Sequence, residues 1–310
     1  MQVAAAHGAA ILCSAAIQYI ADFGVFISNA ANAKECQLMQ VRPGEKYMSW
    51  IDVNGVSIHY RLQGATEKPL VVFFHEIGGS LESFREVAPY LLTHFQVLSF
   101  DQRGSGLSEK VRTSFGIDDL VSDVSELVRV VVGDVSCHLV AAAAAGLQAL
   151  RFYERFEATV MSITLCNPAL GVDPSRALAL NERADLAEKN GIRVGLELTL
   201  DKSYQSELRD DKVFPEVRGR YLSNDPFGFA EANRVLARTD MRSFLPMLHC
   251  PTMVVAGRQD QVRPYQGSEE AAKQIPGSRF ELVEGGGHFV TVTSPKQVGN
   301  LLANFLGSVR

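Results

Sequence analysis

Residues 70–79 read Leu-Val-Val-Phe-Phe-His-Glu-Ile-Gly-Gly, an apolar run that ends in a glycine-rich turn. Five consecutive apolar residues bounded by a turn are typical of a strand that is buried on both faces. Strands of this kind belong to parallel sheets covered by helices. Because glycines allow the backbone to approach a ligand closely, the turn could supply one N–H to an oxyanion.

Apolar and amphipathic segments alternate on both sides of this run. Asn54-Gly55 predicts a tight hairpin between strands at 50–53 and 56–60, because both turn positions need a positive φ. Apolar runs predict further strands at 95–100, 137–142, 160–166, 252–256 and 280–283. Amphipathic spacing predicts helices at 83–93, 118–132, 144–156, 268–274 and 295–306. This order predicts an α/β fold with a mostly parallel central sheet that helices cover on both faces.

Residues 1–45 form an N-terminal segment outside this alternation. Asp22 is the only formally charged side chain before Lys34, and the apolar residues recur at roughly helical intervals. The spacing predicts a helical extension that docks on the body or on a second subunit, which would make a homodimer possible. A targeting segment and a membrane span are the alternatives. Gln18 and Asp22 interrupt the apolar stretch that a targeting segment needs, and Asp22 also counts against a membrane span.

Residues 173–245 are the second exception, because they are polar, helical in pattern and without a strong strand signal. They predict a cap over the carboxyl ends of the strands, where sheets of this kind bind ligands. The α/β core would then comprise residues 46–172 and 246–310. The cap is rich in arginines, most of them expected to be solvated or paired, whereas one or two could face the pocket and clamp a carboxylate. These arginines are Arg176, Arg183, Arg193, Arg209, Arg218, Arg220, Arg234, Arg238 and Arg242.

The composition excludes several classes of protein. The chain has 310 residues, of which 46% are hydrophobic and 21% charged, so it is too apolar to be disordered. Its five scattered cysteines include no C-x-x-C pair, which argues against a metal site or a disulfide framework and favours a reducing cytoplasm. A formal net charge of −5 argues against nucleic acid as the main partner. We expect a cytoplasmic protein with a small-molecule substrate and no cofactor.

Polar residues with catalytic potential follow the predicted strands. Asp260 follows the strand at 252–256, and His288 follows the strand at 280–283 after three glycines. An Asp and a His at neighbouring strand ends suit a general base that a carboxylate orients. Asp173 is a weaker candidate for the acid. Asp101 and Arg103, after the strand at 95–100, are expected to brace loops beneath the site.

These motifs in this order resemble the α/β-hydrolase superfamily over residues 48–310. The matches are the His-x-x-Gly-Gly turn at His75, Asp-x-Arg-Gly-x-Gly at Asp101, Gly-x-x-Asp at Asp260 and Gly-Gly-His at His288. The resemblance implies a catalytic triad with Asp260 as the acid and His288 as the base. It also implies an oxyanion hole formed by the N–H groups of Ile77 and Ala144, with substrate contacts available to His75, Glu76 and Gly78, and no metal.

The nucleophile of the family is absent. The superfamily carries a serine on a sharp strand-to-helix elbow of pattern G-x-S-x-G. Here residues 141–147 read Ala-Ala-Ala-Ala-Ala-Gly-Leu, which puts Ala143 where the serine is expected. Three explanations are open. The chain is an inactivated Ser→Ala variant of a hydrolase of small esters, lactones or amides, or a natural pseudoenzyme that binds a ligand, or an oxygenase or lyase that needs only the His–Asp pair. The first is favoured because Asp260 and His288 are retained.

Glu76 is a second departure, since many relatives carry glycine after the histidine of this turn. The simpler interpretation is a carboxylate that faces solvent or pairs with an arginine. The functional interpretation is a substrate contact, or a second carboxylate that works with the base.

Overall fold

The computed structural model describes residues 47–196, 200–204, 206–209 and 212–309. The chain divides into two units, residues 1–40 and 41–310, and all described residues belong to the second. The helical extension predicted for residues 1–45, and the homodimer that it would form, therefore lie outside the described residues.

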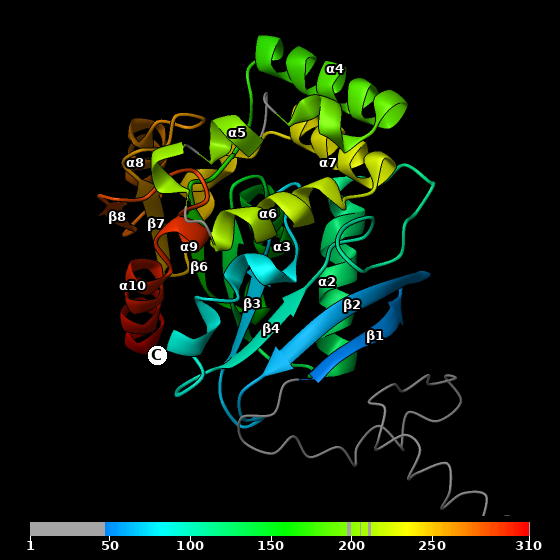
Figure 1. Cartoon of the computed structure of the whole chain (residues 1–310). Helices are drawn as coiled ribbons and strands as arrows, with labels where there is room; N and C mark the ends of the chain where they lie inside the picture. The colour runs from blue at the N-terminus through cyan, green and yellow to red at the C-terminus, as the bar shows by residue number, and fades with distance from the viewer. Residues whose placement is uncertain (1–46, 197–199, 205, 210–211, 310) are drawn as a thin grey trace, which may run out of the picture. The chain divides into compact units, whose positions relative to one another are not determined.

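An eight-stranded sheet forms the centre of the described region (Figure 1). The strands are β1 (Tyr47–Val53), β2 (Val56–Gln63), β3 (Leu70–Phe74), β4 (Gln96–Phe100), β5 (Cys137–Ala142), β6 (Val160–Cys166), β7 (Thr252–Gly257) and β8 (Arg279–Val283). Their order is β1-β2-β4-β3-β5-β6-β7-β8. The β1–β2 and β2–β4 pairs are antiparallel and the other pairs are parallel. The predicted α/β fold with a mostly parallel sheet is confirmed.

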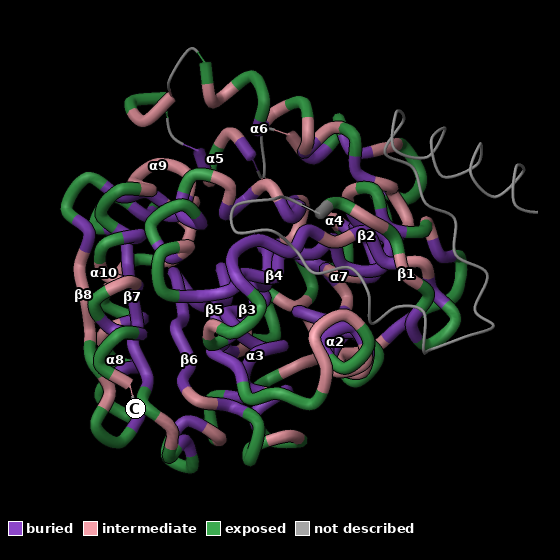
Figure 2. Tube along the Cα trace, turned by 90° about the horizontal axis from the view of Figure 1, so that it is seen from below, coloured by how far each residue is buried: buried purple, intermediate pink, exposed green. Residues whose placement is uncertain are grey.

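Helices and short turns cover the two faces of the sheet. Along β3, Leu70, Val72 and Phe74 join a core with α2 (Ile117–Val131), α3 (Ala145–Phe156) and α8 (Tyr265–Gln274). Val71 and Phe73 point the other way and join a core with α10 (Pro295–Ser308). This alternation follows from the two-residue period of a strand. Figure 2 shows the inner strands buried between these layers.

The prediction of a helix at 83–93 is wrong. The chain instead forms two 3₁₀ turns, η2 (Leu81–Phe84) and η3 (Ala88–Tyr90). Pro89 lies inside the predicted helix, and proline lacks a backbone N–H and clashes with the preceding helical turn. Another turn, α9 (Val290–Thr293), follows His288 and was not predicted from the sequence.

A helical insert, residues 174–247, separates β6 from β7. It contains α4 (Pro174–Asn190), α5 (Leu200–Ser203), α6 (Val213–Leu222), α7 (Pro226–Arg238) and the 3₁₀ turns η5 (Ile192–Gly195), η6 (Ser206–Leu208) and η7 (Arg242–Met247). Figure 1 shows α4 to α7 gathered at one end of the sheet. The side-chain amide of Asn224 donates to the carbonyl of Gly78 at 2.9 Å, and a Cβ at Gly228 would collide with the carbonyl of Gly104. The insert therefore lies against the loops that follow β3 and β4.

No helix in the described ranges combines the length and the apolar character that crossing a lipid bilayer requires.

His138 in β5 makes the stability of the fold sensitive to acid. Its side chain is 1% exposed and its Nδ1 lies 2.8 Å from the Ser162 hydroxyl. Burial lowers the pKa of His138 to about 4. The unfolded chain binds a proton at this histidine below about pH 6.5, whereas the folded chain does so only near pH 4. Stability is therefore lost as the pH falls through this window.

We expect the contribution of His138 to the free energy of unfolding to fall by about 2 kcal/mol between pH 7.5 and 5. His138→Gln, which can still bond Ser162, should remove that part of the pH dependence. Urea unfolding at the two pH values measures it. His94→Gln is the matched control, because His94 is exposed and its replacement should leave the pH dependence intact. Equal pH dependence in the parent chain and the His138→Gln variant would contradict the assignment.

Candidate active site

Ala143 lies at a sharp turn between β5 and α3. Its φ is 50°, in the left-handed region that side chains other than Asn and Asp rarely adopt. The turn is held by three backbone hydrogen bonds: Ala143 N–H donates to Cys166 at 2.9 Å, and its carbonyl accepts from Gly146 at 3.1 Å and from Ala169 at 2.9 Å. Such a strand-to-helix turn presents the side chain of residue 143 at the end of the strand. The alanine therefore occupies an elbow, as its place in the sequence predicts.

Asp260 and His288 meet at the ends of β7 and β8. The Asp260 carboxylate oxygen Oδ2 accepts from His288 Nδ1 at 2.8 Å. Its Oδ1 accepts from the backbone N–H groups of Val262 and Arg263, both at 2.8 Å, and the residue is 4% exposed. With the proton on Nδ1, neutral His288 has a free lone pair on Nε2. The arrangement can therefore act as an oriented general base.

Asp173, the weaker candidate for the acid, lies elsewhere. It precedes α4, its side chain is exposed, and its carboxylate is 3.5 Å from the Arg242 guanidinium. It does not line the cavity that contains His288.

Asn167 is a site residue that the sequence did not reveal. It follows β6, is fully buried and has a φ of 45°. Its side-chain amide donates to the carbonyls of Gly287 at 2.9 Å and His288 at 2.7 Å, and its Oδ1 accepts from Gly257 N–H at 2.8 Å. One side chain thus ties together the two loops that carry Asp260 and His288. If Asp260 and His288 are catalytic, Asn167 is a positioning residue, because it acts only through the backbone of their loops.

Asn167→Ala is expected to lower the free energy of unfolding by about 3 kcal/mol, because it leaves three buried or partly buried backbone groups without partners. In a variant that turns over substrate, kcat should fall about 10- to 100-fold with little change in KM, because His288 is displaced. Denaturant unfolding and steady-state kinetics measure the two effects. Asn54→Ala is the matched control: Asn54 has a φ of 50° but lies in the hairpin, where its side chain bonds Asp123. An equal loss of kcat in both variants would overturn the positioning role.

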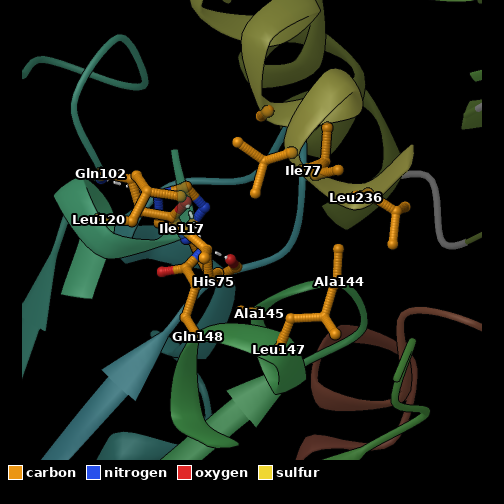
Figure 3. Close-up of a pocket in the computed structure, with 12 residues that line it drawn as sticks. His75, Ile77, Gln102, Ile117, Leu120, Ala144, Ala145, Leu147, Gln148 and Leu236 are labelled. Atoms are coloured by element: carbon orange, nitrogen blue, oxygen red, sulfur yellow. Dashed lines mark hydrogen bonds between the residues drawn. The ribbon is translucent and has the colours of Figure 1, made fainter. Parts of the chain in front are cut away.

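The N–H groups of Ile77 and Ala144 are available for an oxyanion. In the described ranges neither N–H donates a hydrogen bond to another backbone or side-chain group. Ile77 follows β3 and Ala144 follows the elbow, so the two come from neighbouring parallel strands. Both border a small cavity that Figure 3 shows, and both also line the larger cavity described next.

A cavity of about 70 Å³ lies between the core and the helical insert. Its lining includes Ala143, His288, Ile77, Ala144 and Glu76. Residues that follow β3, β5 and β8 thus border one space, together with side chains of the insert. Among the described residues, no group of three or more His, Cys, Asp or Glu side chains could hold a metal ion.

His75 and Gly78 shape the turn after β3. His75 is 2% exposed; its Nδ1 donates to the carbonyl of Glu76 at 2.8 Å, and its Nε2 accepts from Gln102 N–H at 3.0 Å. Both ring nitrogens are therefore engaged, and Figure 3 shows the ring beside the smaller cavity. Gly78 has a φ of 78°, and a Cβ there would lie 2.8 Å from the Tyr221 ring of the insert. Neither residue lines the larger cavity.

Glu76 is neither solvent-facing nor paired with an arginine, contrary to the simpler interpretation. Its side chain lines the larger cavity and is 7% exposed. Oε1 accepts from the Ser83 hydroxyl at 2.9 Å, and Oε2 has no hydrogen-bond partner among the residues that the structure describes. A carboxylate oxygen is thus available in the cavity that contains His288.

Asp101 and Arg103 hold the loop after β4, as expected. Asp101 accepts from the backbone N–H of Leu81 at 2.7 Å and of Leu107 at 2.8 Å. Arg103 binds both carboxylate oxygens of Asp123 at 2.6 Å. The hydrogen bonds of both side chains therefore stabilise the loop.

Comparison with known proteins gives consistent results. A family model described as alpha/beta hydrolase fold matches residues 69–295. The chain is 22% identical to 3-oxoadipate enol-lactonase 1 of Acinetobacter baylyi, across 83% of this chain and 95% of that protein. It is 27% identical to the "Putative carbamate hydrolase RutD" of Agrobacterium fabrum, across 80% and 98% of the two chains. The crystal structure of the enol-lactonase from Burkholderia xenovorans superposes with a TM-score of 0.79 at 23% identity, covering 84% of this chain and all (100%) of that one.

Proposed function

The chain belongs to the alpha/beta hydrolase fold family, and from that premise we propose that its cavity is the site of acyl transfer from a small ester, lactone or amide, carbamates included. One observation carries the proposal: Ala143, Ile77, Ala144 and His288 line the same cavity, and His288 is bonded to Asp260. The two relatives are named for a lactone and a carbamate, which supports a small carbonyl substrate. The helical insert would act as the cap that closes over it.

The proposed mechanism needs a serine at position 143. Its hydroxyl would attack the substrate carbonyl while His288 Nε2 takes the proton, and Asp260 would stabilise the imidazolium. The N–H groups of Ile77 and Ala144 would bind the oxyanion. His288 would then return the proton to the leaving oxygen or nitrogen, and water would release the acid by the reverse sequence.

With alanine at position 143 the chain has no hydroxyl to acylate. We therefore propose that it is the Ser→Ala variant of such a hydrolase, which binds its substrate and scarcely turns it over. Loss of a triad nucleophile can lower kcat about 10⁶-fold. The retained His288–Asp260 pair and the free N–H groups support this interpretation. The experiment that tests it is Ala143→Ser.

A second candidate uses the His–Asp pair without a nucleophile, as a cofactor-free oxygenase or a lyase would. The observation that favours it is the unpartnered Oε2 of Glu76, which could move a proton in the same cavity as His288. A third candidate is a ligand-binding protein without catalytic activity, and only the alanine at position 143 favours it. Both predict that a serine at position 143 produces no ester turnover.

A further inference from the structure

Three arginines without a carboxylate partner line the larger cavity. Arg176 and Arg183 lie on α4 of the insert, and Arg263 lies in the loop after β7. None of the three forms an ion pair in the described part of the chain. Four other arginines of the insert each contact a carboxylate: Arg209 with Asp201 at 2.9 Å, Arg220 with Glu216 at 3.8 Å, Arg234 with Asp185 at 2.6 Å and Arg242 with Asp240 at 2.6 Å.

These three residues, the arginine cluster, are close enough to affect one another. Burial lowers the pKa of Arg183 to about 10, and the charge of Arg176 acts in the same direction. Burial likewise lowers the pKa of Arg263 to about 10; the charges of Arg176 and Arg183 act in the same direction, and the Asp260 carboxylate acts against them. With pKa values near 10, Arg183 and Arg263 remain charged at neutral pH. Like charges gathered in a half-buried space repel, so the cluster costs free energy unless an anion joins it.

The Arg183 side chain is fixed by its contacts and keeps a hydrogen-bond donor available for such an anion. Its Nη2 donates to Oδ1 of Asn233, a fully buried residue whose amide nitrogen donates to the carbonyl of Phe229 at 2.7 Å. Its guanidinium carbon lies 5.8 Å from the centre of the Phe229 ring. Its Nε is buried and has no hydrogen-bond partner within the described ranges. The group is therefore fixed in place while one donor is unused.

The cluster lies beside the proposed catalytic groups. Arg263 is three residues after Asp260, and its backbone N–H bonds the Asp260 carboxylate. With His288 neutral, the charged side chains among the described residues that line the cavity are the three arginines and Glu76, so three positive charges face one negative charge. This described lining is net positive even though the whole chain carries a formal charge of −5.

We propose that the arginine cluster binds a carboxylate of the substrate, so that the substrate is a small acid whose reacting carbonyl lies at residue 143. A planar guanidinium matches a carboxylate with two parallel hydrogen bonds. The position of the reacting carbonyl rests on the proposed function; the binding of the carboxylate does not.

The test uses the full chain with Ala143, because it should bind without turnover. The probes are 5-oxotetrahydrofuran-2-carboxylate, a small lactone acid, its neutral carboxamide of the same size, and inorganic phosphate, each titrated by calorimetry. We expect the carboxylate to bind about 10- to 100-fold tighter than the carboxamide, the range for hydrogen bonds to a charged group. Arg183→Gln and Arg263→Gln should each weaken carboxylate binding about tenfold and leave carboxamide binding unchanged.

Arg193→Gln is the matched control, because Arg193 is an exposed arginine of the insert that does not line the cavity and forms no ion pair within the described residues. It should leave all affinities unchanged. If a Gln variant fails to fold, Arg183→Lys and Arg263→Lys are the replacements. They keep the positive charge but lose the planar guanidinium, and they should still weaken binding of the carboxylate. Equal binding of the two lactones, no carboxylate binding at millimolar concentration, or tighter binding of phosphate than of the carboxylate would overturn the inference.

Different results would overturn the carboxylate-binding inference and the proposed hydrolase function. Turnover of neutral p-nitrophenyl acetate by Ala143→Ser without a carboxylate preference in binding would overturn only the inference. An arginine-dependent carboxylate preference without any turnover by Ala143→Ser would overturn only the proposed function.

Discussion

Ala143→Ser is expected to give the chain an ester-hydrolysing activity up to about 10⁶-fold above that of the alanine form. The new hydroxyl would stand on the elbow between β5 and α3, in the cavity that also contains His288 and the free N–H groups of Ile77 and Ala144. Serine and alanine place Cβ in the same position, so the turn at φ 50° carries no added strain. Steady-state hydrolysis of p-nitrophenyl acetate and of a γ-lactone measures the gain.

Ala145→Ser provides the control for this experiment, because it adds the same hydroxyl two residues beyond the elbow, on a side chain that packs in the core. It should produce no turnover. If Ala143→Ser is folded and equally inactive, the hydrolase proposal is wrong, and the ligand-binding or His–Asp alternatives take its place.

Asp260→Asn, introduced together with Ala143→Ser, is expected to lower kcat about 10⁴-fold. Asp260 uses both oxygens as acceptors, one for His288 Nδ1 and the other for two backbone N–H groups. An amide has one oxygen, so its NH₂ must face either the backbone donors or His288. If its oxygen keeps the two backbone bonds, its NH₂ faces Nδ1 and selects the tautomer with the proton on Nε2, which cannot accept a proton from serine.

The measurement is kcat for the double variant against Ala143→Ser alone, over a range of pH. Asp173→Asn is the matched control, since Asp173 is the exposed carboxylate that the sequence offered as a second candidate, and it should leave kcat unchanged. A large loss with Asp173→Asn and none with Asp260→Asn would contradict the assignment of the acid.

The strands could be predicted closely from the sequence. The predicted bounds of the strands at 137–142 and 160–166 match β5 and β6, because uninterrupted apolar runs between turns have few other ways to be buried. Amphipathic spacing wrongly predicted a helix at 83–93, because Pro89 breaks the helical hydrogen-bond pattern regardless of which residues are apolar.

The site was predictable where topology alone brings residues together. Asp260 and His288 follow adjacent parallel strands, so their meeting follows from the sheet. Asn167 was missed because its side-chain partners, Gly257, Gly287 and His288, lie about 90 to 120 positions away in the sequence. Arg263 was missed because its sequence neighbours do not reveal that it shares a cavity with two arginines of α4.

We propose that residue 143 is the nucleophile position of an otherwise complete site. The decisive measurement is intact-protein mass spectrometry after treatment with a fluorophosphonate, which phosphonylates activated serines. We expect one adduct per chain in Ala143→Ser, located at residue 143, no adduct in the alanine form, and loss of the adduct when His288→Ala is added. An unlabelled Ala143→Ser protein, or an adduct at another residue, would show that residue 143 is not the nucleophile position.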